Sequence, residues 1–360
     1  MGDAYSLIES QNDNNLPASR LRESIEHKQL NVYKFKGQEY VDRLDIGRLY
    51  HPSPERREGL TIERYFSKEG EDPFESVGEY ETTSLSIKDY NTGEVIFSMN
   101  DAVFPKSWDN QVARQIVAQK YFFKPNKNEW KEKLSEKLGK DHEYSPAHLI
   151  NRVTNFIAEE GFKLGYFKTE KDKEIFAEEL KWLQINRFFA FNSPVQFNAG
   201  IYNEYNIKGS EGINYHRDAK TGEVTKNESG DYVYPQCHAC FIKGPLDNLE
   251  SILKHAEDEG AVFASGSGIG QNIGVLRGEG EPLSGGGKAS GPLSFLKIYD
   301  DHAGTIKSGG KSRRAARMTT MQYTHPDVMK FIRGKVREDK KALDLMKLGY
   351  EPGMDGEAVR

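Results

Sequence analysis

The segment from Tyr234 to Arg317 alternates glycine-rich runs with amphipathic helix patterns, and this alternation restricts the possible fold more than any other feature. The runs are Gly266-Ser-Gly-Ile-Gly270-Gln-Asn-Ile-Gly274, Ser284-Gly-Gly-Gly287 and Lys307-Ser-Gly-Gly310-Lys-Ser-Arg-Arg314. The surrounding pattern predicts a strand at 239–243, a helix at 248–259, a strand at 273–277, a helix at 292–306, a strand at 317–323 and a last helix from 326. Strands that alternate with helices are typical of an α/β fold with parallel strands.

The residues before this segment are predicted to be mainly helical. Helix patterns cover 111–122, 146–162 and 170–189; Ser145-Pro146 starts the second, and the capping-box form Thr169-x-x-Asp172 starts the third. A hairpin is expected at 84–97 around Asn91-Thr-Gly93, whereas 191–200 and 201–233 are predicted to be loops. We therefore expect a polar N-terminal extension at 1–59, a mainly helical domain at 60–189 and an α/β domain at 190–360.

Composition and charge exclude several classes of protein. The net charge of −5 argues against a general nucleic-acid binder, and the small basic cluster at 307–317 suits an anionic small molecule instead. No apolar run is long enough to span a membrane, and the N-terminus lacks the apolar core of a secretory signal, which predicts a cytoplasmic protein. A chain of 360 residues with two cysteines has no disulfide framework.

The two cysteines lie two residues apart, in Tyr-Pro-Gln-Cys237-His-Ala-Cys240-Phe. A thioredoxin-like pair would sit at a helix N-terminus, but this pair precedes a strand-like run. Zinc would need two further ligands, and none of the nine histidines forms a second paired motif, so no metal site is expected. An inert buried thiol is the alternative for each residue, and we favour it for Cys237.

Neither standard nucleotide-binding fingerprint fits the glycine runs. Gly310-Lys311-Ser312 resembles the end of a P-loop, but the earlier glycine would fall on Thr305, and the spacing from Gly266 to Gly274 is not that of a dinucleotide fold. Asp247 is interpreted as a helix cap or as an acceptor for a ribose hydroxyl, with the cap favoured. Arg277 is interpreted as a phosphate ligand or as one half of a surface ion pair.

From about Leu60 to Arg360 the chain closely resembles the class II, adenosylcobalamin-dependent ribonucleotide reductases. Ordered blocks carry the resemblance: Ile62-Glu-Arg-Tyr-Phe66, Val103-Phe-Pro-Lys-Ser-Trp108, Ala118-Gln-Lys-Tyr-Phe122, Asn192-Ser-Pro194, Pro235-Gln-Cys-His-Ala-Cys-Phe241, Leu276 to Lys288, Ser294-Phe-Leu-Lys297, Ile306-Lys-Ser-Gly-Gly310, Arg313-Arg-Ala-Ala316 and His325-Pro-Asp327. The resemblance implies that 190–360 forms the first half of the family's α/β barrel, behind an N-terminal helical domain.

The family's active site is implied at three places in this sequence. Cys240 matches one of the two cysteines that reduce the substrate and become a disulfide, while Cys237 falls where the family has no cysteine. Asn192 and Ser193 match the loop that contacts the substrate phosphate, with the backbone of Ala239 nearby. The implied reaction removes the 2′ hydroxyl of a ribonucleoside diphosphate or triphosphate by radical chemistry, with adenosylcobalamin as cofactor and a thioredoxin-like protein as reductant.

The family's allosteric site is implied as well. Asp247 matches the acid that binds the ribose of a deoxynucleoside triphosphate effector, Arg277 matches a phosphate ligand, and the first effector loop matches 278–288, including Lys288. The second loop, which carries the effector's influence to the substrate base, matches 308–317. Its implied specificity residues are Gly309, Gly310, Lys311, Ser312, Arg313 and Arg314. The amphipathic helices beside the glycine runs are expected to form a homodimer contact.

The family's radical cysteine and the partner of Cys240 match no residue of this sequence. The resemblance therefore implies the N-terminal component of a split or truncated reductase, inactive without a complementary C-terminal half. The alternative hypothesis is a non-catalytic, nucleotide-binding regulatory module derived from the same family. No partnership with a membrane or with nucleic acid is expected.

Overall fold

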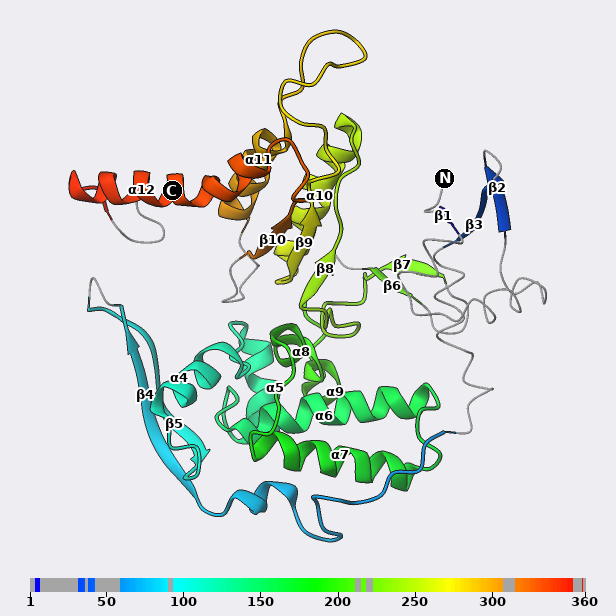
Figure 1. Cartoon of the computed structure of the whole chain (residues 1–360). Helices are drawn as coiled ribbons and strands as arrows, with labels where there is room; N and C mark the ends of the chain where they lie inside the picture. The colour runs from blue at the N-terminus through cyan, green and yellow to red at the C-terminus, as the bar shows by residue number, and fades with distance from the viewer. Residues whose placement is uncertain are drawn as a thin grey trace. The chain divides into compact units, whose positions relative to one another are not determined.

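The computed structural model describes residues 59–89, 93–210, 215–217, 223–306, 315–351 and 358, together with the strand backbones at 4–6, 32–35 and 38–42 (Figure 1). The chain divides into two compact units. The first comprises Met1–Glu63, Ala158–Phe176 and Asp218–Glu223; the second comprises Arg64–Ile157, Ala177–Arg217 and Val224–Arg360. The domain boundaries expected at 59/60 and 189/190 stay a prediction.

The first unit contains a small antiparallel sheet with the order β1-β3-β2, formed by β1 (Ala4–Ser6), β2 (Val32–Phe35) and β3 (Gln38–Asp42). In the same unit, Leu60 forms a parallel bridge with Phe167. The predicted capping box is confirmed, because the Thr169 amide donates to Asp172 Oδ2 at 3.0 Å and the Asp172 amide donates to Thr169 Oγ1 at 3.1 Å. Asp172 also accepts from the Ile62 amide at 2.9 Å, which ties the incoming chain to this helix start.

A long hairpin lies near the start of the second unit. After the short 3-10 helix η2 (Pro73–Val77), β4 (Tyr80–Lys88) pairs antiparallel with β5 (Val95–Pro105), and Ile87 lies opposite Phe97. The predicted hairpin is therefore confirmed and is longer than expected. Asn91 and Thr92 of the expected turn lie outside the described residues.

Four helices follow the hairpin: α4 (Gln111–Lys120), α5 (Asn128–Leu138), α6 (Pro146–Lys163) and α7 (Glu170–Ile185). The three predicted helices are confirmed, although α7 ends at Ile185 because Arg187 adopts a left-handed conformation with φ of 64°. α5 was not expected from the polar sequence, and its single buried side chain, Leu134, joins a cluster with Ile201, Tyr205 and Ile207. The main core of this part joins hairpin and helices through Leu85, Met99, Ala102, Phe104, Ala118, Phe122, Leu149, Val153, Val195 and Ala199.

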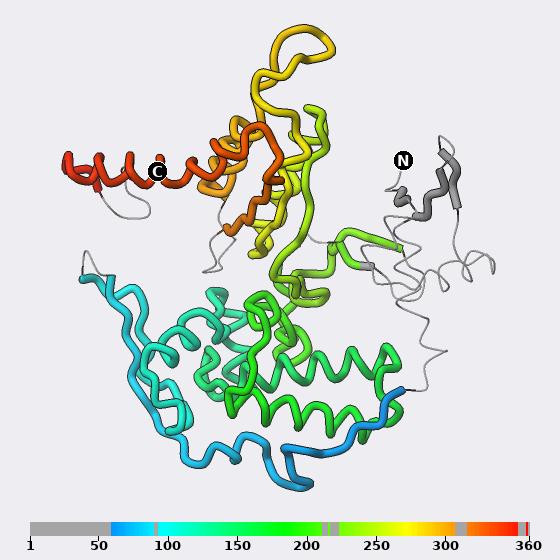
Figure 2. Tube along the Cα trace, in the orientation of Figure 1, coloured from blue at the N-terminus to red at the C-terminus, as the bar shows by residue number. Residues whose placement is uncertain are grey.

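The loop predictions for 191–200 and 201–233 are wrong in part, because two short helices lie there. α8 (Ser193–Asn198) begins at the cap Asn192, and α9 (Ile201–Tyr205) follows Gly200, whose φ of 77° turns the chain between them. The trace of this part of the chain is green in Figure 2. Burial of Ile201 and Tyr205, which are 0% and 4% exposed, supplies stabilisation that a count of polar residues does not reveal. Farther on, β6 (Tyr215–Arg217) and β7 (Val224–Lys226) form an antiparallel pair.

The predicted parallel α/β arrangement is confirmed. β8 (Cys240–Ile242), β9 (Gly268–Asn272) and β10 (Arg317–Thr320) form a parallel sheet with the order β10-β9-β8 (Figure 1). α10 (Leu249–Ala264) connects β8 to β9, and α11 (Pro292–Thr305) lies in the connection from β9 to β10. α12 (Val328–Lys347) follows the sheet.

The strand expected at 273–277 is wrong, because the glycine run just before it forms the middle strand. A Cβ atom at Gly268 would lie 3.0 Å from the Ala316 carbonyl oxygen and 3.6 Å from Cys240 Sγ. The absence of a side chain at Gly268 therefore lets the start of β9 approach Ala316 and Cys240 closely. Next to the strand, Ile252, Ala256, Ile273, Leu276 and Tyr299 form the core between α10, α11 and the sheet.

Candidate functional site

Cys240 begins β8 and is exposed, as a thiol that exchanges electrons with another molecule must be. The adjacent backbone is fixed on the β9 side, because the Gly268 amide donates to the Ala239 carbonyl at 2.8 Å and Ser267 Oγ donates to the His238 carbonyl at 2.6 Å. Strand pairing thus holds Ala239 and Cys240, two of the predicted site residues, in one short extended segment. Their chemical roles stay a prediction.

Cys237 lies in a different environment. It is partly buried and packs against the main hydrophobic core, and no disulfide joins it to Cys240. The pair also precedes a strand, and α10 starts only at Leu249. These positions favour the interpretation of two separate thiols over a redox pair at a helix N-terminus.

Asn192 and Ser193 form the start of α8. The Asn192 side chain accepts from the Val195 amide at 3.3 Å, and Ser193 Oγ lies 3.1 Å from the Tyr121 hydroxyl. At the other end of α8, the buried Asn198 donates from Nδ2 to the Gln236 carbonyl at 2.6 Å, four residues before Cys240. The structure therefore links the predicted substrate-phosphate residues to the predicted redox strand through α8.

Asp247 and Arg277, the two residues predicted to bind the effector, contact each other. Arg277 donates to Asp247 from Nε at 2.9 Å and from its backbone amide at 3.2 Å, and both side chains are about one-third exposed. The prediction that Asp247 caps the following helix is wrong. The cap is Asn248, whose side chain accepts from the Ser251 amide at 2.8 Å, so the Asp247 carboxylate is directed to Arg277 instead.

The segment after Arg277, which contains the third predicted effector residue, Lys288, folds back on itself. Lys288 forms an antiparallel bridge with Pro282. The Glu279 amide donates to Asp327 Oδ2 at 2.7 Å, which anchors the start of this loop to the residue that precedes α12. Burial by itself would raise the pKa of Asp327, but the Glu279 amide and the Lys330 ammonium outweigh it and lower that pKa, so Asp327 stays ionised as an anchor.

Arg317, the last residue of the basic cluster at 307–317, forms a buried ion pair within the protein. Its guanidinium contacts both carboxylate oxygens of Glu259 in α10, and Nη2 lies 2.7 Å from Oε2. The two side chains are 7% and 0% exposed. Burial alone would lower the pKa of Arg317, but Glu259 and Asp300 raise it above its ordinary value. Arg317 is therefore engaged within the protein, whereas Lys307, Lys311, Arg313 and Arg314 of the cluster lie outside the described residues.

The predicted specificity residues Gly309, Gly310, Lys311, Ser312, Arg313 and Arg314 lie outside the described residues. Sequence reasoning also missed a largely buried network beside α8, in which Arg152 contacts Glu143 and the Tyr121 carbonyl, and Glu143 accepts from the Tyr205 hydroxyl. Arg152 lies in α6 and Glu143 lies in the loop before it. In a sequence, single charged residues of this kind cannot be distinguished from surface residues. Their burial depends on contacts with residues far away in the chain.

Two family models match the chain. One, described as the class II vitamin B12-dependent ribonucleotide reductase, matches residues 82–187, and the other, described as the ribonucleotide reductase barrel domain, matches residues 238–350. The vitamin B12-dependent ribonucleotide reductase of Rhodopirellula baltica is 41% identical over 303 residues, which are 84% of this chain. The chain belongs to the class II vitamin B12-dependent ribonucleotide reductases.

Other curated members of the family give the same result. The vitamin B12-dependent ribonucleotide reductase of Bradyrhizobium diazoefficiens is 36% identical over 80% of this chain, and the vitamin B12-dependent ribonucleoside-diphosphate reductase of Thermoplasma acidophilum is 41% identical over 29% of it. The aligned regions are 28%, 25% and 14% of the Rhodopirellula, Bradyrhizobium and Thermoplasma proteins. The chain thus spans about a quarter of the length of the reductases that match most of it.

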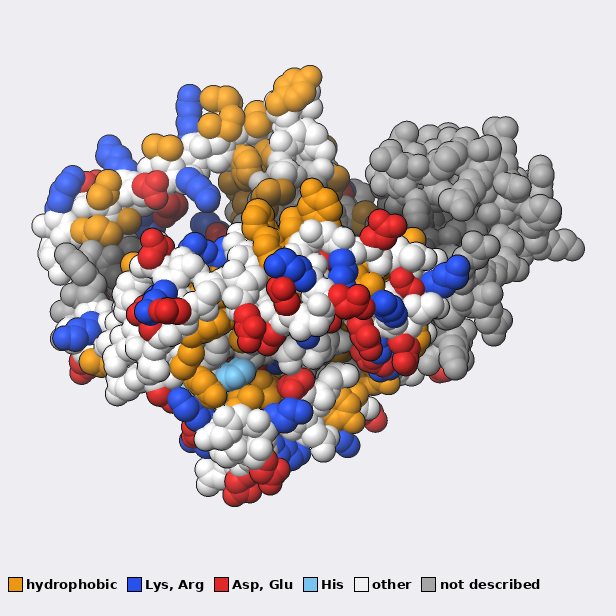
Figure 3. All heavy atoms as spheres, turned by 90° about the horizontal axis from the view of Figure 1, so that it is seen from below, with side chains coloured by type: hydrophobic (Ala, Val, Ile, Leu, Met, Phe, Trp, Pro, Cys, Tyr) orange, Lys and Arg blue, Asp and Glu red, His pale blue; other side chains and the backbone are white. Residues whose placement is uncertain are grey.

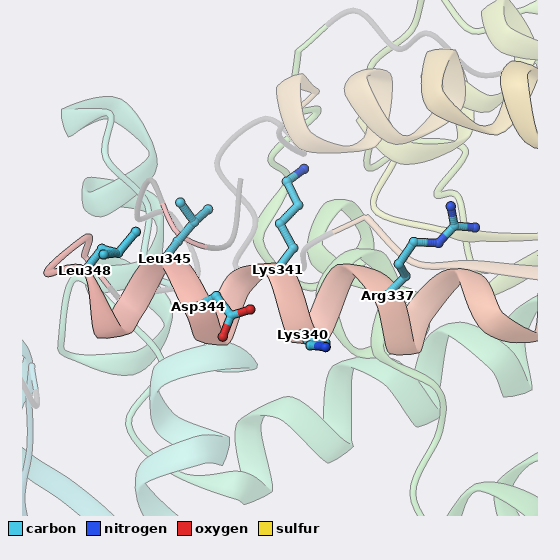
Figure 4. A pocket seen from close by; sticks show the side chains of 6 residues that line it. All are labelled: Arg337, Lys340, Lys341, Asp344, Leu345 and Leu348. Atoms are coloured by element: carbon cyan, nitrogen blue, oxygen red, sulfur yellow. The ribbon is translucent and has the colours of Figure 1, made fainter.

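Membership of this family implies adenosylcobalamin as the cofactor. The described residues contain no group of three or more His, Cys, Asp or Glu side chains placed to hold a metal ion. The corrin ring ligates its own cobalt, so the fit of cobalamin depends instead on a cavity that encloses the ring. One cavity, of about 360 Å³, lies along α12 and is lined by Arg337, Lys340, Lys341, Asp344, Leu345 and Leu348 (Figure 4). These residues belong to a single exposed helix, which does not enclose a large ring system. We assign no cobalamin contact to the described part of the chain.

On the face drawn in Figure 3, acidic and basic side chains are interspersed, with hydrophobic side chains between them. Within the described part of the chain, no helix is both long and apolar enough to cross a lipid bilayer.

Proposed function

We propose that this chain supplies the reductant cysteine, the substrate-phosphate residues and the effector site of a class II ribonucleotide reductase. The observation that carries the proposal is the geometry around α8, which ties Ser193 and the strand of Cys240 to one framework within a chain of this family. Catalysis would need the rest of the reductase barrel, either in continuous sequence or as a complementary C-terminal half. The reducing cytoplasm suits such thiol chemistry.

The proposed reaction converts a ribonucleoside diphosphate to the deoxyribonucleotide, with a triphosphate as the other candidate substrate. The 2′ carbon–oxygen bond breaks and the oxygen leaves as water. Cys240 and a second thiol from the remaining part of the enzyme together supply two electrons and two protons, and an S–S bond forms between them. A thioredoxin-like dithiol would then reduce this disulfide for the next turnover. The exposure of Cys240 supports access by both partners.

The test compares two cysteine variants in the enzyme that is assembled with the complementary half, adenosylcobalamin and a dithiol. Cys240→Ser is expected to lose turnover by several orders of magnitude, because one of the two reducing thiols is absent. Cys237→Ser, the matched control three residues away, is expected to retain most of the activity, because Cys237 packs against the core. Full turnover in Cys240→Ser would disprove the redox assignment.

We also propose that the Asp247–Arg277 region binds a deoxynucleoside triphosphate. Both side chains are partly exposed and meet next to the start of α10, so a triphosphate would compete with Asp247 for the guanidinium while the carboxylate accepts from the ribose hydroxyl. Exposed apolar side chains on α10 and α11, Leu249, Leu253 and Ile298, support a homodimer contact beside this site.

Arg277→Ala is expected to weaken the binding of dATP or dTTP by about 1–3 kcal/mol, the range of a charge-assisted hydrogen bond. Isothermal titration of the 360-residue chain measures this change, and Lys341→Ala on α12, also an exposed cation in an ion pair, serves as the control. Equal affinity for the effector in wild type and Arg277→Ala would remove the phosphate role.

A further inference from the structure

The side chain of Tyr121 spans the short helix α8. Tyr121 directly follows α4, and its hydroxyl lies 3.1 Å from Ser193 Oγ at the first residue of α8. Its ring stacks on Phe197 near the other end of α8, with centroids 5.4 Å apart and planes inclined by 23°. A residue outside α8 thus contacts both ends of the helix that presents Ser193.

A buried ion pair holds the backbone of Tyr121 and the end of α8 together. Arg152 in α6 and Glu143 both have side chains that are 0% exposed, and Arg152 Nε lies 2.7 Å from Glu143 Oε1. The same guanidinium donates to three carbonyls, which belong to Ala199 at 2.7 Å, Gln196 at 2.9 Å and Tyr121 at 3.3 Å. One rigid group therefore fixes the residue after α4 and the C-terminal turn of α8 relative to each other.

Glu143 completes this frame from the opposite side. It accepts from the Tyr205 hydroxyl at 2.8 Å and from the Phe123 amide at 2.8 Å. Burial, reinforced by the Glu143 carboxylate, raises the pKa of Tyr205, so its hydroxyl remains a donor. Removal of two charges from water is unfavourable, and apolar residues would fill the same volume without that penalty. The hydrogen bonds to backbone carbonyls are what the charged pair adds.

We propose that Tyr121 is a positioning residue for the Ser193 hydroxyl, and that the Glu143–Arg152 pair keeps the two residues in register. The inference rests on the proposed contact between Ser193 and the substrate phosphate. Phosphate oxygens accept hydrogen bonds, so Ser193 must donate its proton to the ligand. Tyr121 is then the donor to Ser193 Oγ, which selects one rotamer of the serine and directs its proton toward the phosphate.

The test removes the Tyr121 hydroxyl and leaves the ring. In Tyr121→Phe, we expect the Kd for CDP to rise about 3- to 10-fold, the effect of one net hydrogen bond. The ring contact with Phe197 and the melting temperature should be retained, and the Kd for dATP should not change. Tyr65→Phe is the matched control, because Tyr65 is 84% exposed and loses the same atom. Isothermal titration of the 360-residue chain gives the Kd values for CDP and dATP, and a thermal melt of each variant gives the melting temperature.

Ser193→Ala separates the two levels of the proposal. If CDP binding weakens in Ser193→Ala but not in Tyr121→Phe, the positioning role is overturned and the phosphate contact stands. If CDP does not bind, or binds equally well to Ser193→Ala, the phosphate contact itself is overturned, and the positioning role with it. Weakening in both variants, without change in Tyr65→Phe, is the expected result.

The role of the ion pair has a separate readout. Arg152→Lys keeps the charge but not the planar fork that reaches three carbonyls. Hydrogen exchange in this variant should accelerate together at the amides of α8 and at residues 121–123, by at least 10-fold. Acceleration in one of these segments alone would refute the proposal that the ion pair holds α8 and residues 121–123 together.

Discussion

The buried pair between Arg317 and Glu259 gives the sharpest prediction about how the sheet is held to its helices. Arg317 is the first residue of β10, and Glu259 lies in α10 with its side chain completely buried. Removal of one partner from a buried ion pair costs about 3–5 kcal/mol, because the other charge stays desolvated. Arg317 retains Asp300 and the Tyr299 carbonyl as partners, so we expect Glu259→Ala to lose about 3 kcal/mol, at the lower end of that range.

Hydrogen exchange measures this loss locally, without the assumption that the whole chain unfolds as one unit. A loss of about 3 kcal/mol corresponds to about 100-fold faster exchange of the protected amides. The acceleration is expected in β9 and β10 and not in α6, which has a different core. Glu338→Ala is the control, since the Lys341–Glu338 pair is about 70% exposed on both sides and should change exchange little.

A double variant tests the physical reason. Glu259→Leu combined with Arg317→Met removes both charges and keeps the volume apolar, so the pair should recover most of the loss seen in Glu259→Ala. The reasoning is refuted if Glu259→Ala accelerates exchange in β10 no more than Glu338→Ala does. It is also refuted if the double variant is as unstable as the single one, because the loss would then not come from an uncompensated charge.

Two further predictions concern a turn and an anchor. Gly200→Ala should destabilise the chain by about 3 kcal/mol or more, because its φ is 77° and its new Cβ would lie 2.1 Å from the Arg152 carbonyl oxygen. The control is Gly139→Ala, which has a φ of 74° and nothing within 4 Å, and which should lose only about 1–2 kcal/mol because alanine disfavours the left-handed conformation. Equal shifts in melting temperature for the two variants would show that the clash at Gly200 is relieved. Asp327→Asn should destabilise the loop at Glu279 by about 2 kcal/mol at neutral pH, since a charge-assisted acceptor is lost. The pKa of Asp327 is lowered in the folded state, so the stability that its carboxylate contributes is present above about pH 3.9 and is lost as the pH falls through the folded-state pKa. A difference in stability between wild type and Asp327→Asn that grows on acidification would contradict the assignment.

Local patterns in the sequence determined the larger elements. The apolar spacing and caps of α6 and α7, the alternation of the β4–β5 hairpin and the periodicity of α10 and α11 all act within one element, so the sequence predicted these elements. Their ends were less well predicted, because the hairpin is longer than expected and α10 continues to Ala264. The order of strands and helices was sufficient to predict a parallel sheet. The ordered blocks were sufficient for the family, which both family models confirm.

Tertiary contacts determined the segments whose structure the local sequence did not predict. The run Gly268–Asn272 was expected to be a glycine-rich loop, and it is the central strand, where a Cβ atom at Gly268 would lie 3.0 Å from the Ala316 carbonyl oxygen. Asp247 was expected to cap a helix, yet it faces Arg277, since Asn248 occupies the capping position. α8 and α9 are too short for a periodic pattern, and burial against α6 and Glu143 stabilises them.

The sequence by itself therefore determined the family, the α/β class and the identities of Cys240, Ser193, Asp247 and Arg277 as candidates, because each depends on residue type and order along the chain. The tertiary structure decided which of these residues meet and what holds them. Tyr121 contacts Ser193 from 72 positions away in sequence, and Arg152, bound to Glu143, contacts the backbone of Tyr121 and of the end of α8. Hydrogen bonds to backbone carbonyls stabilise that arrangement. Every residue has the same backbone carbonyl, so these bonds cannot be predicted from a pattern of side chains.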